Sequence, residues 1–139
     1  MIKLIVGVKG TGKTKWLVDE VHAAAKISKG AVVCIEYGRK LTYHIRSAVR
    51  LIDAKDYDIK DAETLYGFVC GILSGNYDVT EVFVDSALQI CGEDVEAFEK
   101  FIYKLDAITE KIGVECFITV SYPIDQLPEG LKKYITSEH

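Results

Sequence analysis

Apolar residues along this 139-residue chain gather in short runs, which alternate with longer segments of helical spacing. Five runs rich in β-branched and aromatic residues predict strands at residues 2–6, 31–36, 49–54, 81–85 and 114–120. A further strand, at an edge of the sheet, is expected at residues 132–136. Continuous apolar runs of this kind are typical of strands buried on both faces of a parallel sheet.

Three longer segments have apolar residues at helical spacing and therefore predict helices. The first covers about residues 13–28, and the third covers about residues 93–112. The second is capped by Asp61, and its Gly67 and Gly71 lower helix stability, so we expect close packing against the sheet there. Strands that alternate with helices predict an α/β fold, with a mostly parallel sheet between two helical layers.

Chain length and charge distribution limit the classes of function that the sequence favours. The chain has the length of one domain, residues 1–139, and can bury a core without disulfides or metals. Residues 1–60 hold 12 Lys/Arg against 6 Asp/Glu, whereas residues 61–139 hold 5 against 15. An acidic chain with an acidic second half is a poor general nucleic-acid binder. The positive first part suits a small anionic ligand.

Nothing in the sequence predicts a membrane segment or a metal-binding cysteine cluster. No apolar run approaches the roughly 20 residues that span a bilayer. The apolar stretch at residues 1–7 is also too short to be a secretory signal. The four cysteines, Cys34, Cys70, Cys91 and Cys116, form no C-x-x-C pair. Three lie in apolar runs, which favours buried thiols. We expect a cytoplasmic protein that does not bind membranes.

Residues 7–14, GVKGTGKT, match the phosphate-loop pattern G-x-x-x-x-G-K-[ST] at every constrained position. The glycines allow backbone N–H groups to surround a phosphate, and the helix that follows adds the positive end of its dipole. Lys13 is placed to reach the β- and γ-phosphates, and the Thr14 hydroxyl to bind Mg²⁺. The expected nucleotide-binding residues are Gly7, Val8, Lys9, Gly10, Thr11, Gly12, Lys13, Thr14 and Lys15.

A second candidate site residue ends the strand at residues 81–85. Asp85 follows an apolar run, so its carboxylate is expected at the carboxyl edge of the sheet. A carboxylate at that edge can hold a water molecule on a Mg²⁺ ion bound beside the phosphate loop. The expected metal-binding residues are therefore Thr14 and Asp85.

The segments GVKGTGKT, VVCIE, VFVDS and ITVS follow one another over about residues 1–122. In this the chain resembles P-loop NTPases of the RecA/KaiC-like branch. It is also similar to small bacterial ATP-binding proteins labelled as twitching-motility ATPases. The resemblance implies a single-domain, three-layer αβα P-loop NTPase fold in which one strand, residues 114–120, separates the Walker A and Walker B strands. Direct adjacency of those two strands would indicate the kinase–GTPase branch instead.

The resemblance also implies roles for two residues at strand ends. Glu36 corresponds to the glutamate that polarises the attacking water in RecA-like enzymes, although it can equally be an exposed carboxylate at a strand end. Ser121 corresponds to a polar position that senses the γ-phosphate, or is simply the end of its strand. The expected catalytic residues are Lys13, Glu36 and Asp85.

The expected function is ATP binding with a Mg²⁺-dependent ATPase activity that is weak or is stimulated by a protein partner. An arginine finger cannot be assigned, because Arg39, Arg46 and Arg50 are close to the motifs in sequence only, and turnover without one should be slow. One alternative is a non-hydrolysing, nucleotide-dependent switch whose moving part is the ambiguous segment 37–48. A small-molecule kinase is less favoured, because no arginine follows Arg50. No N-K-x-D motif indicates a GTPase.

Overall fold

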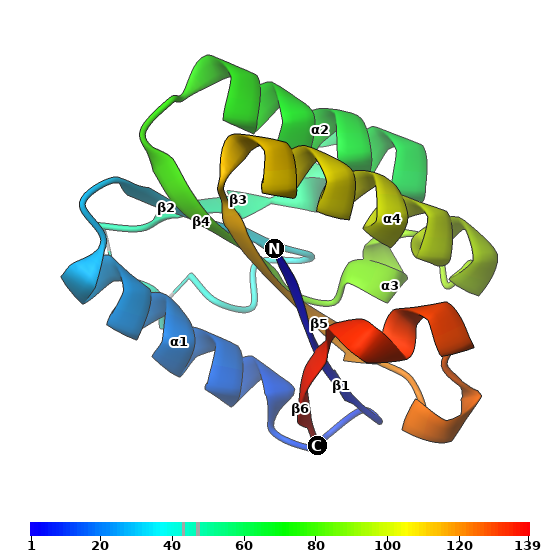
Figure 1. Cartoon of the computed structure of the whole chain (residues 1–139). Coiled ribbons are helices and arrows are strands. Elements are labelled where there is room, and N and C mark those ends of the chain that lie inside the picture. Colours follow the sequence, from blue (N-terminus) through cyan, green and yellow to red (C-terminus); the bar gives the residue numbers. More distant parts are fainter. Residues whose placement is uncertain (43, 47) are drawn as a thin grey trace.

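The computed structural model describes residues 1–42, 44–46 and 48–139. At its centre is one six-stranded sheet in which all neighbouring strands are parallel, in the order β3-β2-β4-β5-β1-β6 (Figure 1). The strands are β1 (Ile2–Gly7), β2 (Ala31–Glu36), β3 (Arg50–Asp53), β4 (Val79–Val84), β5 (Glu115–Ser121) and β6 (Ile135–Glu138). The expected mixed α/β class with a parallel sheet is confirmed.

Helices cover both faces of the sheet. Helix α1 packs on one face, whereas α2, α3 and α4 lie on the other (Figure 1). The α-helices are α1 (Lys13–Ile27), α2 (Ala62–Gly75), α3 (Ala87–Ile90) and α4 (Val95–Ile112), and short 3-10 turns span Ala54–Tyr57, Ile124–Gln126 and Glu129–Tyr134. This arrangement is compatible with a three-layer αβα layout. Among the residues described, no helix has the length and apolarity needed to cross a bilayer.

Helix α2 begins where the sequence predicts. The Asp61 side chain accepts a hydrogen bond from the Thr64 N–H, and the Thr64 hydroxyl accepts one from the Asp61 N–H. Together these bonds satisfy backbone donors that the first turn of a helix leaves open. Leu65, Val69 and Leu73, spaced four residues apart, are buried against the sheet side of the helix.

The prediction that Gly67 and Gly71 pack closely on the sheet is wrong. Both are exposed, and a Cβ atom at either position would meet no atom of residues 1–42, 44–46 or 48–139 within 4 Å. The reason is helical periodicity, because residues 67 and 71 lie about 200° around the helix from the buried row at 65, 69 and 73. These glycines therefore weaken the helix without providing a close approach.

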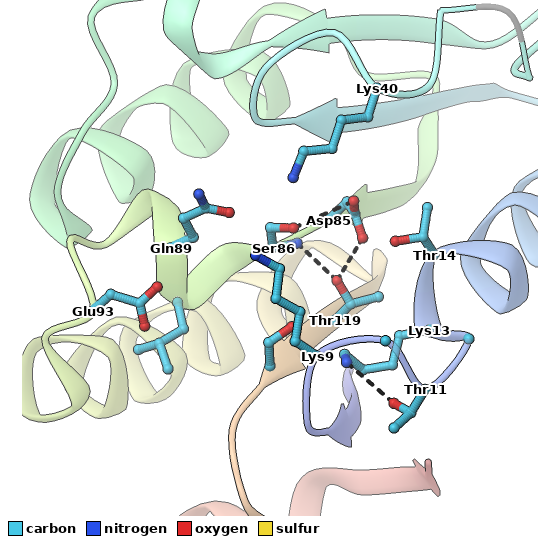
Figure 2. A pocket seen from close by; sticks show the side chains of 14 residues that line it. Lys9, Thr11, Lys13, Thr14, Lys40, Asp85, Ser86, Gln89, Glu93 and Thr119 are labelled. Carbon is cyan, nitrogen blue, oxygen red and sulfur yellow. Dashed lines mark hydrogen bonds between the residues drawn. The ribbon is translucent and has the colours of Figure 1, made fainter.

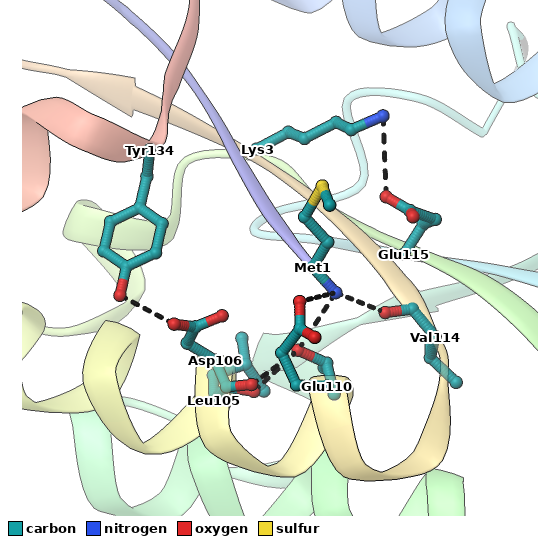
Figure 3. A network of polar contacts seen from close by, with 9 residues as sticks. Met1, Lys3, Leu105, Asp106, Glu110, Val114, Glu115 and Tyr134 are labelled. Atoms are coloured by element: carbon teal, nitrogen blue, oxygen red, sulfur yellow. Dashed lines mark hydrogen bonds and ion pairs between the residues drawn. The ribbon is translucent and has the colours of Figure 1, made fainter.

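The strand expected at residues 132–136 begins later, at Ile135, and follows the 3-10 turns of Glu129–Tyr134. The turns bring Leu131 into the core and allow the Tyr134 hydroxyl to donate a 2.8 Å hydrogen bond to Asp106 Oδ2 on α4 (Figure 3). Of the expected strand, the β-branched residues Ile135 and Thr136 lie in β6, whereas residues 132–134 belong to the turns that pack on α4. Segment 37–48, ambiguous in the sequence, forms turns and bends at the residues described, and positions 43 and 47 lie outside them.

Candidate functional site

A cavity of about 390 Å³ opens at the carboxyl ends of β1, β4 and β5 (Figure 2). One wall is the loop between β1 and α1, and the other walls come from the segment after β4, the end of β5 and the turn after β2. Its lining residues are Lys9, Gly10, Thr11, Gly12, Lys13, Thr14, Lys40, Asp85, Ser86, Leu88, Gln89, Glu93, Thr119 and Ser121. The parallel sheet creates this site, because it brings the carboxyl ends of separate strands to one edge.

The loop wall depends on backbone conformations that favour glycine. Gly10 and Gly12 have φ values of 84° and 89°, in the left-handed region, where a side chain adds strain. No atom of the described residues lies within 4 Å of a Cβ built at either glycine, so backbone conformation and not space requires glycine there. Gly7 differs, since a Cβ there would clash with the backbone carbonyl of His139 and would lie 2.9 Å from Thr11 Oγ1.

The Lys13 side chain folds onto the loop between β1 and α1. Its side chain is 6% exposed, and Nζ donates hydrogen bonds to the Val8 carbonyl at 2.8 Å and to Thr11 Oγ1 at 3.4 Å. Burial lowers the pKa of the Lys13 ammonium, and the negative charge of Asp85 offsets only part of that effect. A bound anion would stabilise this partly desolvated ammonium, and the positive end of the α1 dipole would attract the same anion.

Helix α1 adds open donors to the same wall. Its N-cap is Gly12, which offers no side-chain hydrogen bond, and its first turn contains no acidic residue. The first N–H groups of a helix have no intrahelical partner and need an external acceptor. An anion in the cavity would supply that acceptor at the positive end of the helix dipole.

Asp85 is fixed at the opposite side of the cavity floor. It is 2% exposed, and its Oδ1 accepts a 2.7 Å hydrogen bond from the Thr119 hydroxyl. Thr119 Oγ1 accepts in turn from the Ser86 N–H at 2.8 Å, and Ser86 has a left-handed φ of 59°. This network orients the carboxylate, whose Oδ2 accepts, within the described residues, one long hydrogen bond, from the Ser86 hydroxyl at 3.5 Å. Oδ2 is therefore the oxygen available to a ligand.

The residues present fit a Mg²⁺ ion held jointly with phosphate. The exposed Thr14 hydroxyl and the Asp85 carboxylate line the same cavity. Mg²⁺ in nucleotide sites takes one or two protein oxygens and completes its octahedron with phosphate and water. Within the described part of the chain, no three His, Cys, Asp or Glu side chains gather to hold a metal. A cation here would depend on the oxygens of its nucleotide.

Of the ten residues expected to bind nucleotide, seven line this cavity, including Ser121, and three do not. The predicted catalytic residue Glu36 is also absent from the lining. Gly7 is buried beneath the loop, Val8 is exposed, and Lys15 points to solvent beside Asp19 at 3.4 Å. Glu36 ends β2 as expected, but it is 1% exposed and its Oε1 accepts a 2.8 Å hydrogen bond from the Leu41 N–H. Its water-polarising role stays a prediction.

Five polar lining residues were not anticipated as site residues, namely Lys40, Ser86, Gln89, Glu93 and Thr119. Thr119 had a signal in the sequence, because it is a polar residue inside the apolar run CFITV. The parallel register pairs Val84 with Ile118, which brings Asp85 beside Thr119. Neither Lys40 nor the residues of the segment after β4 belongs to a spacing pattern, so only the fold could reveal them.

The arginines near the motifs do not reach the cavity. Arg39 donates to both carboxylate oxygens of Asp56 at 3.1 Å and lies 3.8 Å from Asp53. Arg46 and Arg50 are exposed. No arginine is among the cavity's lining residues in the described part of the chain, and its cations are Lys9, Lys13 and Lys40.

The cysteines behave as core residues. All four are free, and Cys34, Cys91 and Cys116 are buried, as expected. Burial raises the pKa of the Cys91 and Cys116 thiols to about 12, which leaves them protonated and unreactive near neutral pH. These thiols take no part in the cavity.

Comparison with known proteins adds no family. No protein-family model matches this chain, and no curated protein is significantly similar to it. The function must therefore be argued from the cavity and its residues.

Proposed function

We propose that this chain is an ATP-binding protein of the P-loop NTPase superfamily that uses Mg²⁺ and hydrolyses ATP slowly unless a partner stimulates it. One observation carries the proposal: the partly desolvated ammonium of Lys13, on a loop with two left-handed glycines, shares a single cavity with the buried carboxylate of Asp85. A phosphate chain with its cation needs positive charge and one oriented carboxylate close together.

The strand order supports the RecA/KaiC-like branch. Strand β5 lies between β1, which precedes the glycine loop, and β4, which precedes Asp85. In the kinase–GTPase branch those two strands would be neighbours. The observed order therefore favours an ATPase or an ATP-dependent switch over a small-molecule kinase.

Each residue of the cavity has a distinct role in this proposal. Backbone N–H groups of residues 9–14 surround the phosphates, and Lys13 leaves the Val8 carbonyl to neutralise them. Thr14 and Asp85 hold the cation, which supplies charge neutralisation to the phosphate oxygens when it is bound. Thr119 keeps the Asp85 carboxylate in one orientation through its 2.7 Å hydrogen bond. Ser121, paired with Gly7 across β5 and β1, closes the wall beside the loop.

Slow turnover follows from the cations that line the cavity. An arginine finger contributes about 10³–10⁵ to the rate in this chemistry, and the lining cations in the described part of the chain are lysines. A partner, or a second copy of the chain, could supply an arginine in trans. The alternative, a switch that binds but does not hydrolyse ATP, shares the same binding site.

Equilibrium binding and phosphate release test this proposal together. The wild type should bind ATP in the presence of Mg²⁺, and Lys13→Ala should weaken binding by at least about 10-fold, because a charge-assisted contact is lost. Lys29→Ala is the matched control, since Lys29 is an exposed lysine beyond the far end of α1. Equal ATP affinities for the wild type and Lys13→Ala would refute nucleotide binding at this loop. Binding without phosphate release above the Lys13→Ala level would instead establish the switch.

A further inference from the structure

The turn after β2 is held in place over the cavity by side chains that the proposed function does not otherwise use. Gly38 and Arg39 have left-handed φ values of 95° and 48°. These two residues reverse the chain directly after Glu36 and carry Lys40 back toward the ends of the strands. We call residues 38–41 the β2 turn.

Asp53, at the end of β3, anchors the start of the β2 turn. Its Oδ1 accepts hydrogen bonds from the Gly38 N–H at 2.9 Å and from the Lys55 N–H at 3.0 Å. Arg39 lies 3.8 Å from Asp53 and pairs with both oxygens of Asp56. Burial raises the pKa of Asp53, but these N–H donors and Arg39 more than reverse that effect and lower it overall.

Glu36 anchors the end of the β2 turn. Its buried Oε1 accepts the Leu41 N–H at 2.8 Å, and the Leu41 side chain is 1% exposed in the cluster that contains Leu17 and Val21 of α1. A buried carboxylate is costly unless it accepts hydrogen bonds. The bond to Leu41 therefore determines where the turn returns to the protein.

Lys40 is an exposed residue of the β2 turn, as is its neighbour Arg39. Figure 2 shows the Lys40 side chain across the cavity from Lys13, with the ammonium directed inward toward Asp85 and Ser86. Among the residues described, Lys40 takes part in no ion pair, whereas its neighbour Arg39 pairs with Asp53 and Asp56. The β2 turn thus places the ammonium of Lys40, which has no ion-pair partner among the described residues, across the cavity from the loop between β1 and α1.

The position of Lys40 in the cavity indicates which phosphate of a bound nucleotide it would contact. A phosphate loop surrounds the α- and β-phosphates of a bound nucleotide. Thr14 and Asp85 would hold a cation that neutralises negative charge on the outer phosphates. The terminal phosphate would therefore lie on the Asp85 side of the cavity, toward which the Lys40 ammonium points in Figure 2.

We propose that Lys40 is a cation supplied in cis to the terminal phosphate of a bound nucleoside triphosphate, and that Glu36 is the positioning residue that holds Lys40 there. This inference rests on the proposed function. It makes the site selective for triphosphate over diphosphate without an arginine from another subunit. It also gives the buried Glu36 carboxylate a role through Leu41 rather than through contact with the reacting atoms.

Affinities for Mg²⁺-ATP and Mg²⁺-ADP, measured by calorimetry on the full chain, test the role of Lys40. Lys40→Ala should weaken ATP binding by about 10-fold, the value of one charge-assisted contact. It should change ADP binding by less than about 2-fold, because salt screens the more distant phosphates. Lys29→Ala, which removes the same charge elsewhere, should change neither affinity. Equal losses for both nucleotides, or no loss for either, would overturn the assignment.

Two variants of Glu36 test the positioning role. Glu36→Gln keeps an amide oxygen that can accept the Leu41 N–H, so it should retain the wild-type ratio of ATP to ADP affinity. Glu36→Ala should lose the preference for ATP as Lys40→Ala does, with circular dichroism used to select conditions in which the variant is folded. Retention of the preference in folded Glu36→Ala, or its loss in Glu36→Gln, would refute positioning through Leu41.

These results are separable from those that test the proposed function. If the wild type binds no nucleotide, or if Lys13→Ala binds ATP like the wild type, nucleotide binding itself fails. If Lys13→Ala loses binding but Lys40→Ala keeps the wild-type preference for ATP, only the inference about Lys40 fails.

Discussion

Removing the hydrogen bond between Thr119 and Asp85 tests how the site holds its buried carboxylate. Thr119 is 2% exposed within β5, and its hydroxyl both donates to Asp85 Oδ1 at 2.7 Å and accepts the Ser86 N–H at 2.8 Å. Thr119→Val replaces the hydroxyl with a methyl group of similar size. The change leaves packing intact and removes both hydrogen bonds at once.

The expected loss of stability follows from the charge and burial of the partners. A hydrogen bond to an ionised group contributes about 1.5–3 kcal/mol, and an unsatisfied buried donor costs about 1–3 kcal/mol. The Ser86 N–H is only partly buried and can regain water, so the bond to Asp85 dominates. We expect Thr119→Val to lower the free energy of unfolding by about 2–3 kcal/mol.

Urea denaturation at neutral pH measures this difference, with Thr119→Ser as the matched control. Serine keeps the hydroxyl and both bonds but loses one buried methyl group, which costs about 1 kcal/mol. Thr119→Val should therefore be less stable than Thr119→Ser, although it is closer to threonine in volume. A valine variant at least as stable as the serine variant would show that the hydroxyl network does not hold Asp85 in the free protein.

Two further predictions concern backbone conformation and pH. Gly12→Ala should lower the free energy of unfolding by about 1 kcal/mol, because φ is 89° there. Gly67→Ala, in an open position of α2, should raise it by about 0.5–1 kcal/mol; thermal unfolding that gives both changes the same sign would contradict this contrast. Burial and the bond to Asp106 raise the pKa of Tyr134 to about 12, so its neutral form is favoured in the fold. The stability advantage of wild type over Tyr134→Phe, about 0.5–1 kcal/mol, should be complete below about pH 10 and lost as pH rises toward 12. A difference that stays constant through alkaline urea titrations would refute it.

The elements that the sequence predicts well are those with one dominant signal. Strands β1, β2, β4 and β5 are continuous apolar runs, and α2 and α4 each begin at an aspartate that caps the helix. In those segments local preference and burial agree. The sequence predicts a strand at residues 132–134, which instead form the end of a 3-10 turn, in which the Tyr134 hydroxyl reaches Asp106 on α4. That contact joins residues 28 positions apart and leaves no local trace.

The same distinction separates the parts of the site. Residues 7–14 form a contiguous motif, and Asp85 ends a strand, so each is visible within a few positions of sequence. Thr119 becomes part of the site only through the register of β4 with β5. Lys40 enters only because left-handed residues reverse the chain after β2.

Glu36 illustrates why a strand-end carboxylate alone does not define its own chemistry. The sequence places it correctly at the end of β2, at the edge where the cavity lies. Whether such a carboxylate faces a ligand or a backbone N–H depends on the path of the chain that follows it. Here Gly38 turns that path immediately, and the Leu41 N–H returns within 2.8 Å of Oε1. The carboxylate that resembles a water activator thus accepts a hydrogen bond from the β2 turn through Oε1, and the cation that this turn presents to the cavity is Lys40.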